Sequence, residues 1–381
     1  MSARHCIRIF CTLAISLQAE EVIPHRLDAL SIRNEVRLSI DRGLGWLENK
    51  QNSDGSWSLP EQPALTALVL TAFANEPSDV LKNRRKECAK GYDFLKSCVQ
   101  PDGGIYRKGL ANYNTSLALV ALVAAKQPEY QPIIRAARAF VIRQQAKGLP
   151  DESLDGGMGY GPTGSGRQHP DLSNTVVALD ALYRSKVAIG GEAANDPDLD
   201  WKAVITFVQR CQNLPSYNKA QWASDDPDNV GGFVYYPGES MAGETKLPNG
   251  KTALRSYGSM SYAGILSYIY ADVKKDDPRV LAVVEWLRRH YSTEENPGMG
   301  MDGRFYYYQM MAKALSAYGV REVELTDGRK VVWADELARK LFGLQNADGS
   351  WINQSGRWME KDPVLVTAYA VLTLEIIYRA M

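Results

Sequence analysis

The stretch QNSDGSW at residues 51–57 returns almost unchanged as QNADGSW at residues 345–351, and this repetition sets the architecture of the chain. Self-similarity of this kind is the sequence signature of a repeat fold. Asp-Gly is turn chemistry, because Asp accepts hydrogen bonds from nearby backbone N–H groups and Gly takes up a positive φ without steric cost. An amphipathic helix precedes each copy and an apolar run follows it. We therefore interpret both copies as turns between helices, with the Gln amide and the Trp ring tying each turn to its neighbours.

Weaker copies of the same turn lie between these two. Residues 100–106 (QPDGGIY) form a clear copy, and residues 155–160 (DGGMGY), 231–233 (GGF) and 297–300 (PGMG) form fainter ones. The spacing of about fifty residues or more suits a helix pair per repeat. Six such repeats predict one closed domain rather than two separate domains.

The composition is that of a globular protein, with 381 residues, 45% hydrophobic and 23% charged side chains and a net charge of zero. A neutral chain is a poor partner for nucleic acid or for an anionic membrane. We expect a monomer that binds no nucleic acid, no metal and no cofactor. Peripheral contact with a membrane stays open as an alternative.

The first residues read as a targeting segment. Arg4, His5 and Arg8 precede an apolar run over residues 9–17, which ends at a small residue, Ala19. This pattern predicts a signal peptide over residues 1–19 and a single mature domain over 20–381, exported to the periplasm or the cell exterior. The alternative is a frayed N-terminal helix. The run is too short to span a bilayer.

Three cysteines remain after such a signal is removed: Cys88, Cys98 and Cys211. Their number is odd and no CxxC spacing is present. We expect buried small apolar side chains rather than disulfides or metal ligands.

Two sets of helices alternate along the chain. Outer, amphipathic helices are expected over residues 31–50, 78–99, 131–146, 198–212, 277–291 and 333–345. Inner helices, apolar nearly all round, are expected over residues 63–75, 112–126, 171–186, 256–272, 305–319 and 362–379. No run alternates as a strand does. The predicted fold is all-α, an (α/α)6 toroid whose inner ring surrounds a central cavity.

QxxDGSW turns on alternating helices resemble the repeats of squalene–hopene cyclases, within the terpene cyclase and protein prenyltransferase superfamily of α/α toroids. The resemblance covers nearly the whole mature chain and implies an isoprenoid ligand. Cyclases of this type carry two barrel domains, whereas this chain has room for one.

The resemblance also implies a proton donor, the central acid of a DxDDT-like motif at the start of an inner helix. The best match is Asp171-Leu172-Ser173-Asn174-Thr175, in which Ser173 replaces the donor and Asn174 the next carboxylate. A serine hydroxyl cannot protonate an alkene, since an alkene is a very weak base. Asp171 also has a structural interpretation, as the N-cap of the helix.

The other branches of the superfamily fit no better. The stretches that correspond to the prenyltransferase zinc site, at residues 255–259 and 306–309, hold no thiolate or imidazole, and a GCGEQ-like thioester run is absent from the sequence. His169, on the glycine-rich approach to the third inner helix, is a candidate site residue.

Two connections, 147–170 and 213–255, are longer than helix pairs require, and long loops in compact domains are often functional. The second contains Asp225 and Asp226 and ends at Arg255. The acids could bind a cation, orient a head group or supply a displaced catalytic acid. The alternative is a solvated turn.

Aromatic residues gather at the starts of the inner helices. Ring faces make apolar walls that also stabilise cations. The candidate binding residues are Tyr257, Tyr262, Tyr307, Tyr308 and Trp358, with Phe305, Tyr306 and Tyr369 nearby. Two hypotheses follow. Either the toroid binds an isoprenoid, another lipid or a peptide, or it is a terpene cyclase/prenyltransferase-class enzyme with a relocated acid. A carboxylate in a deep, dry part of the cavity would favour the enzyme.

Overall fold

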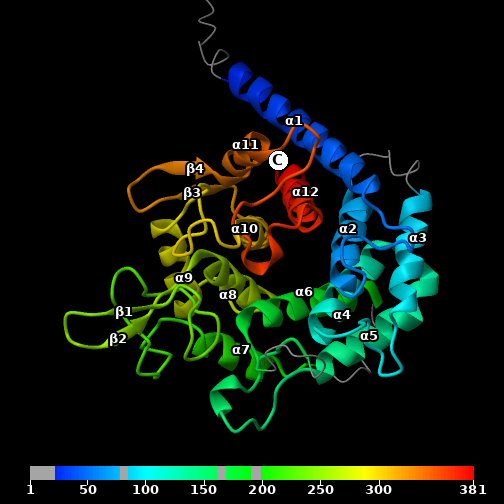
Figure 1. The fold of residues 1–381 in the computed structure, drawn as a ribbon. Helices are drawn as coiled ribbons and strands as arrows, with labels where there is room; N and C mark the ends of the chain where they lie inside the picture. The colour runs from blue at the N-terminus through cyan, green and yellow to red at the C-terminus, as the bar shows by residue number, and fades with distance from the viewer. Residues whose placement is uncertain (1–21, 78–84, 162–168, 190–198) are drawn as a thin grey trace, which may run out of the picture.

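The computed structural model describes residues 22–77, 85–161, 169–189 and 199–381, and the helices in these ranges form two concentric rings (Figure 1). The inner ring consists of α2 (Pro63–Asn75), α4 (Ala111–Ala124), α6 (Leu172–Ile189), α8 (Gly258–Tyr270), α10 (Arg304–Tyr318) and α12 (Pro363–Ala380). The outer ring consists of α1 (Val22–Glu48), α3 (Arg85–Ser97), α5 (Gln131–Arg143), α7 (Trp201–Arg210), α9 (Pro278–Arg289) and α11 (Trp333–Leu344). The predicted all-α toroid is confirmed, and the proposed signal, residues 1–19, lies outside the described residues.

The inner ring is closed. Each inner helix packs against the next, from α2 through α4, α6, α8 and α10 to α12, and α12 packs back against α2. The outer helix α1 packs against α12 and α11, so the first and last repeats meet (Figure 1).

Burial follows the sequence pattern of each ring. In α4 the side chains from Leu117 to Leu122 are all buried, which an apolar helix achieves when it is surrounded on all sides. In α5 only one face is buried, formed by residues such as Ile134 and Phe140, while Arg143 is exposed. Cys98 and Cys211 are buried, as expected, whereas Cys88 is only partly buried; all three are free thiols.

Five of the six turns are fixed in the same way to the inner helix that follows them. The backbone N–H of the residue at the end of the turn donates to a hydroxyl in the first turns of that helix. The bonds are Trp57 to Thr66 (3.0 Å), Ile105 to Thr115 (2.8 Å), Met158 to Thr175 (2.9 Å), Phe233 to Ser261 (3.1 Å) and Trp351 to Thr367 (3.0 Å). The same contact therefore positions the start of five inner helices.

The turns also hold the outer ring together. Gly349 has φ +94°, and a Cβ there would lie 2.6 Å from the Arg42 carbonyl oxygen on α1. The Gln345 Nε2 donates to the Ser39 carbonyl oxygen, also on α1, at 3.0 Å. The Trp351 indole N–H donates to the Leu341 carbonyl oxygen on α11 at 2.8 Å. The last turn thus ties α11 to α1 and closes the ring, as the Gln and Trp of the repeat predicted.

The turn before α10 is different. Here the Asn296 side chain accepts from the Ser259 backbone N–H of the preceding inner helix at 2.9 Å. In α10 tyrosines stand where the other inner helices place a hydroxyl. The Tyr307 and Tyr308 hydroxyls donate to the carbonyl oxygens of Ser292 (2.7 Å) and Thr293 (2.6 Å). Longer side chains therefore replace the short hydroxyl contact in this repeat.

Two small antiparallel hairpins also occur among the described residues. They pair β1 (Glu244–Lys246) with β2 (Thr252–Leu254) and β3 (Glu322–Glu324) with β4 (Lys330–Val332). Neither hairpin was expected from the sequence, because three-residue strands are too short for an alternating pattern.

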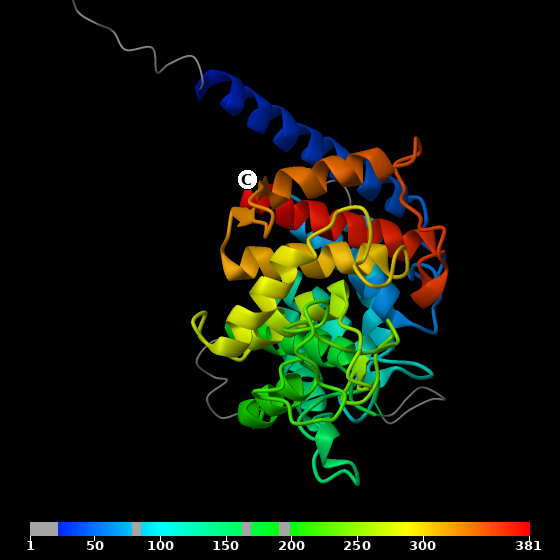
Figure 2. The same ribbon diagram turned by 90° about the vertical axis from the view of Figure 1, so that its left-hand side faces the viewer.

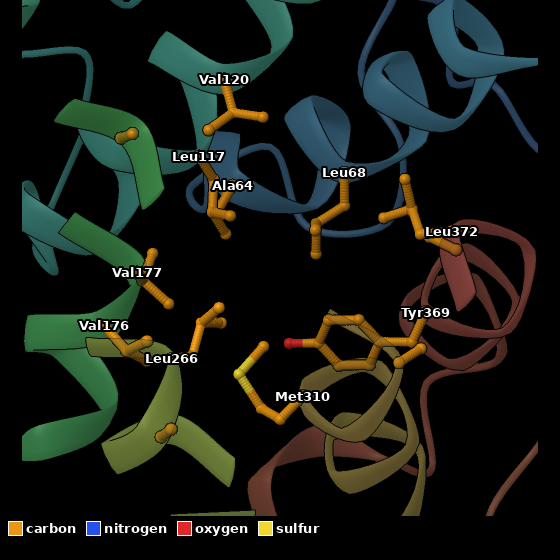
Figure 3. Packing of buried hydrophobic residues seen from close by; sticks show 14 of the residues in the cluster. Ala64, Leu68, Leu117, Val120, Val176, Val177, Leu266, Met310, Tyr369 and Leu372 are labelled. Carbon is orange, nitrogen blue, oxygen red and sulfur yellow. The ribbon is translucent and has the colours of Figure 1, made fainter. Parts of the chain in front are cut away.

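Apolar side chains fill the middle of the barrel. Figure 3 shows them converging from the inner helices: Leu68, Leu117, Val177, Leu266, Met310 and Leu372. Seen from the side, α10 and α12 run next to each other along this core (Figure 2). The apolar helix α12 is long enough to cross a membrane, but most of it is buried in this core.

Because Gly349 lies directly against α1 where the ring closes, its substitution should lower the stability of the fold. Alanine there must adopt a left-handed backbone and press against α1, so Gly349→Ala should lower the free energy of unfolding by about 2 kcal/mol or more. Gly343→Ala is the matched control. Gly343 lies in α11 with nothing within 4 Å of a Cβ, so alanine should be neutral or stabilise by up to about 1 kcal/mol. Urea unfolding of both variants tests this, and equal effects would contradict the closure.

Candidate functional site

A cavity of about 280 Å³ lies at the end of the barrel where the inner helices begin. Aromatic side chains dominate its wall: Tyr113, Tyr160, Tyr235, Tyr257, Tyr306, Tyr369 and Trp358. The remaining wall is formed by Gln62, Leu65, Leu110, Ser173, Ser259, Met260, Met359, Glu360 and Leu365. Leu68 and Leu372 of the apolar core each follow a wall residue by three positions, about one helical turn. The core therefore forms the floor of the cavity.

Hydroxyl pairs join inner helices across this end of the barrel. The Tyr113 hydroxyl on α4 lies 3.2 Å from the Tyr369 hydroxyl on α12. The Ser173 hydroxyl on α6 lies 3.0 Å from the Tyr306 hydroxyl on α10. Neither pair joins neighbouring helices of the ring. These contacts satisfy four wall hydroxyls without a ligand.

Asp171 is fully buried directly before α6. Its carboxylate accepts from the Asn174 backbone N–H at 2.8 Å and from the Asn174 Nδ2 at 2.7 Å. The first of these bonds is an N-cap contact, as expected from sequence. Burial raises the pKa of Asp171 to about 6, although the bonds from Asn174 and from the Tyr235 side chain oppose this shift. Asp171 itself is not part of the cavity wall.

Glu360 is the carboxylate that does line the cavity. It is buried, and its oxygens accept from the backbone N–H groups of Phe305 (3.2 Å) and Tyr306 (2.9 Å) and from the Asn353 side chain (2.6 Å). Phe305 and Tyr306 stand in the first turn of α10, so Glu360 caps that helix from another segment of the chain. Burial raises the pKa of Glu360, and the three donors oppose the rise.

Asp225 and Asp226 do not line the cavity. Asp225 is exposed. The Asp226 carboxylate accepts from the Ser224 hydroxyl at 2.7 Å and from the Asn229 side chain at 3.0 Å. Asn229 in turn accepts the Ser256 backbone N–H at 2.8 Å, directly before α8. The contacts of Asp226 thus organise the loop that leads into α8.

Of three further residues predicted as site residues, Trp358 lies at the cavity and His169 and Arg255 lie away from it. Trp358 forms part of the cavity rim, being 45% exposed, with the Arg357 guanidinium 4.4 Å from its ring centre. The His169 ring packs against the Tyr236 ring with centroids 4.2 Å apart. Arg255 is exposed, and its guanidinium faces the Ala242 carbonyl oxygen at 3.4 Å. Neither His169 nor Arg255 lines the cavity.

The structure separates the predicted aromatic residues into two groups. Tyr257 and Trp358 line the cavity, together with Tyr306 and Tyr369. Tyr262, Tyr307 and Tyr308 do not. The Tyr262 and Tyr307 rings pack together with centroids 5.7 Å apart. This contact joins α8 to α10, and the hydroxyls of Tyr307 and Tyr308 fix the segment that follows α9.

Among the wall residues that sequence reasoning missed are three tyrosines and a carboxylate: Tyr113, Tyr160, Tyr235 and Glu360. Tyr160 and Tyr235 belong to the two long loops, 147–170 and 213–255, whose functional interest was expected. The part of the wall that the structure describes contains no lysine, arginine, histidine or cysteine. Among the described residues, no three His, Cys, Asp or Glu side chains come together in a way that would hold a metal ion.

The raised pKa of Asp171 predicts how stability depends on pH. Between the ordinary value of 3.8 and about 6 the folded chain holds a proton that the unfolded chain has released, so wild-type stability falls as pH rises through this window. Relative to Asp171→Asn, which keeps a cap but does not titrate, the wild type should gain up to about 3 kcal/mol between about pH 7.5 and about pH 3.5. Urea unfolding of both proteins at both pH values measures this change. If the stability difference between wild type and Asp171→Asn is the same at both pH values, the pKa of Asp171 is not raised.

Comparisons with known proteins place this geometry in a fold class. No protein-family model matches the chain, and no curated sequence matches it. Among solved structures it is similar to the type II terpene cyclase MstE from Scytonema, with a TM-score of 0.54 at 13% identity over 91% of this chain and 100% of that chain. A variant of MstE in complex with geranylgeranyl dihydroxybenzoate (substrate) gives a TM-score of 0.53 at 13% identity, over 92% and 100% of the two chains.

Glycosidases share the architecture. The GH76 α-mannanase BT2949 from Bacteroides thetaiotaomicron gives a TM-score of 0.56 at 12% identity, over 91% of this chain and 95% of that chain. Because MstE is matched along its whole length, a chain of one barrel is compatible with the cyclase class. At these identities the likeness shows the fold alone: the chain is a terpene cyclase-like α/α toroid.

Proposed function

We propose that the protein binds an apolar molecule, an isoprenoid or another lipid, in its central cavity and does not protonate alkenes there. The observation that supports this proposal is that the cavity wall is mainly aromatic, while the buried carboxylates near it accept hydrogen bonds from the backbone at helix starts. Ring faces and aliphatic chains make most of the wall, and such surfaces bind apolar ligands by removing them from water. MstE, which has the same fold, is described with a geranylgeranyl-bearing substrate, which supports an isoprenoid-type ligand.

The hydrogen bonds of the two buried carboxylates argue against proton donation. An acid strong enough to protonate an alkene must be held in its neutral form and must direct its O–H at the substrate. Asp171 and Glu360 instead accept N–H donors at the starts of α6 and α10. Such donors favour the ionised form of a carboxyl group. Ser173, at the position of the expected donor, pairs with Tyr306.

A relocated-acid enzyme is the second candidate, and one observation favours it. Glu360 is a carboxyl group in the cavity wall, buried, and with a raised pKa. Loss of one N–H contact on ligand binding would allow it to hold a proton. Asp225 and Asp226, the acids expected from sequence, are the weaker candidates because they lie away from the wall.

We also propose that the chain is exported, with residues 1–19 as the signal. The charged and apolar pattern of these residues supports this. Expression of the full chain in a bacterial host, followed by fractionation and intact-mass measurement, tests it. A mature form that lacks about 19 residues is the expected result, and retention of residues 1–19 would contradict it.

The binding proposal predicts that the purified protein carries an apolar molecule. Organic extraction and mass spectrometry should find one in the wild type. Leu65→Trp, at a buried wall position, should lose it, because the larger ring fills the cavity at a cost of about 1–3 kcal/mol in stability. Leu281→Trp is the control, since Leu281 is an exposed residue of α9. Equal amounts of the molecule in both variants would place it outside the cavity.

A further inference from the structure

One hydroxyl group in the cavity wall differs from the others. Tyr257 is 2% exposed and precedes α8, where its backbone N–H donates to the Phe233 carbonyl oxygen at 3.2 Å. Burial and the neighbouring groups Tyr306 and Asp171 hold the pKa of Tyr257 well above its usual range. The Tyr257 hydroxyl therefore keeps its proton and remains a donor.

This donor has no acceptor within the described part of the chain. Tyr113, Tyr306 and Tyr369 each pair their hydroxyl with another wall hydroxyl or a serine. No described residue accepts a hydrogen bond from the Tyr257 hydroxyl, although its ring forms part of the cavity wall. A buried tyrosine hydroxyl normally finds a partner. The Tyr257 hydroxyl can therefore donate a hydrogen bond to a ligand in the cavity.

The charges around the cavity favour an uncharged ligand. The inner helices present their N-terminal ends here, each equivalent to about half a positive charge. Carboxylates offset these charges at α6, α10 and α12, where Asp171, Glu360 and Asp362 accept backbone N–H groups at 2.8, 2.9 and 2.8 Å. Within the described wall no side chain is cationic, and the Arg357 guanidinium lies over the Trp358 ring at the rim, where its charge also acts on Tyr257. A diphosphate or carboxylate inside the cavity would lose its hydration with no cationic side chain of the described wall beside it.

The volume limits the size of the ligand. A dry cavity of about 150 Å³ holds a benzene-sized molecule. The central cavity, at about 280 Å³, is nearly twice as large, which suits roughly ten to twelve non-hydrogen atoms. A twenty- or thirty-carbon chain would not fit without movement of the wall.

We propose that the Tyr257 hydroxyl donates a hydrogen bond to the ligand, and that the ligand is an uncharged apolar molecule of about ten carbons bearing an acceptor oxygen. A short terpenoid alcohol or ketone has this chemistry. The inference rests on the proposed binding function and assigns Tyr257 as the residue that selects for oxygen.

The test is calorimetric titration of the purified full chain, after removal of co-purified material, with three probes. Geraniol carries the oxygen, 2,6-dimethyl-2,6-octadiene is its hydrocarbon counterpart, and geranyl diphosphate adds charge. Wild-type protein should bind geraniol about 3- to 10-fold more tightly than the hydrocarbon, as one net hydrogen bond implies, and should bind the diphosphate most weakly.

Tyr257→Phe should remove the preference for geraniol and leave hydrocarbon binding unchanged, so the hydrocarbon also reports that the variant is folded. Tyr262→Phe is the matched control, a buried tyrosine of α8 that lies outside the cavity wall, and should keep the preference.

Several results would overturn the inference while the binding function stands. These are equal affinity of the wild type for geraniol and hydrocarbon, a preference that survives in Tyr257→Phe, and tightest binding of the diphosphate. If none of the three probes binds, the inference is wrong; the proposed function then fails only if extraction of the purified protein also finds no apolar molecule.

Discussion

The hydrogen bond from the end of each turn to a hydroxyl of the following inner helix is the contact on which the architecture depends. It recurs in five repeats, between residue pairs such as Trp57 and Thr66 or Trp351 and Thr367. It sets five of the six inner helices at the same height relative to their turns. The cavity exists because the apolar core begins about one turn further along these helices.

The inner helices all begin at this end of the barrel, and the N–H groups of their first turns need hydrogen-bond acceptors. This need explains the carboxylates at the site. Unpaired N–H groups at a helix start must find acceptors when they are buried. Asp171 meets this need at α6 and Glu360 at α10. Burial alone would favour protonated acids, whereas the N–H donors favour carboxylates. A carboxylate bound in this way stabilises the barrel and is poorly placed to give a proton to an alkene.

Sequence reasoning succeeded where a pattern repeats and failed where a contact is unique. The two QxxDGSW copies, six apolar segments and six amphipathic segments specify a toroid, because each repeat must bury its inner helix against its neighbours. Asp171 was correctly expected to cap α6. Tyr160 and Tyr235 were missed because loops carry them into the cavity, and loop paths have no periodicity. Glu360 was missed because its partners lie more than fifty residues away, at Phe305 and Tyr306.

The central claim is that this toroid contains its ligand rather than cyclising it. The most direct measurement is incubation of the purified protein with ten-carbon isoprenoids such as geraniol, which match the size of the cavity, and with longer polyprenyl substrates including squalene, followed by gas chromatography and mass spectrometry of the products. The account predicts that no cyclic product forms and that the substrates are recovered unchanged. Cyclic products that form with the wild type and disappear in Asp171→Asn or Glu360→Gln would contradict it and assign the acid.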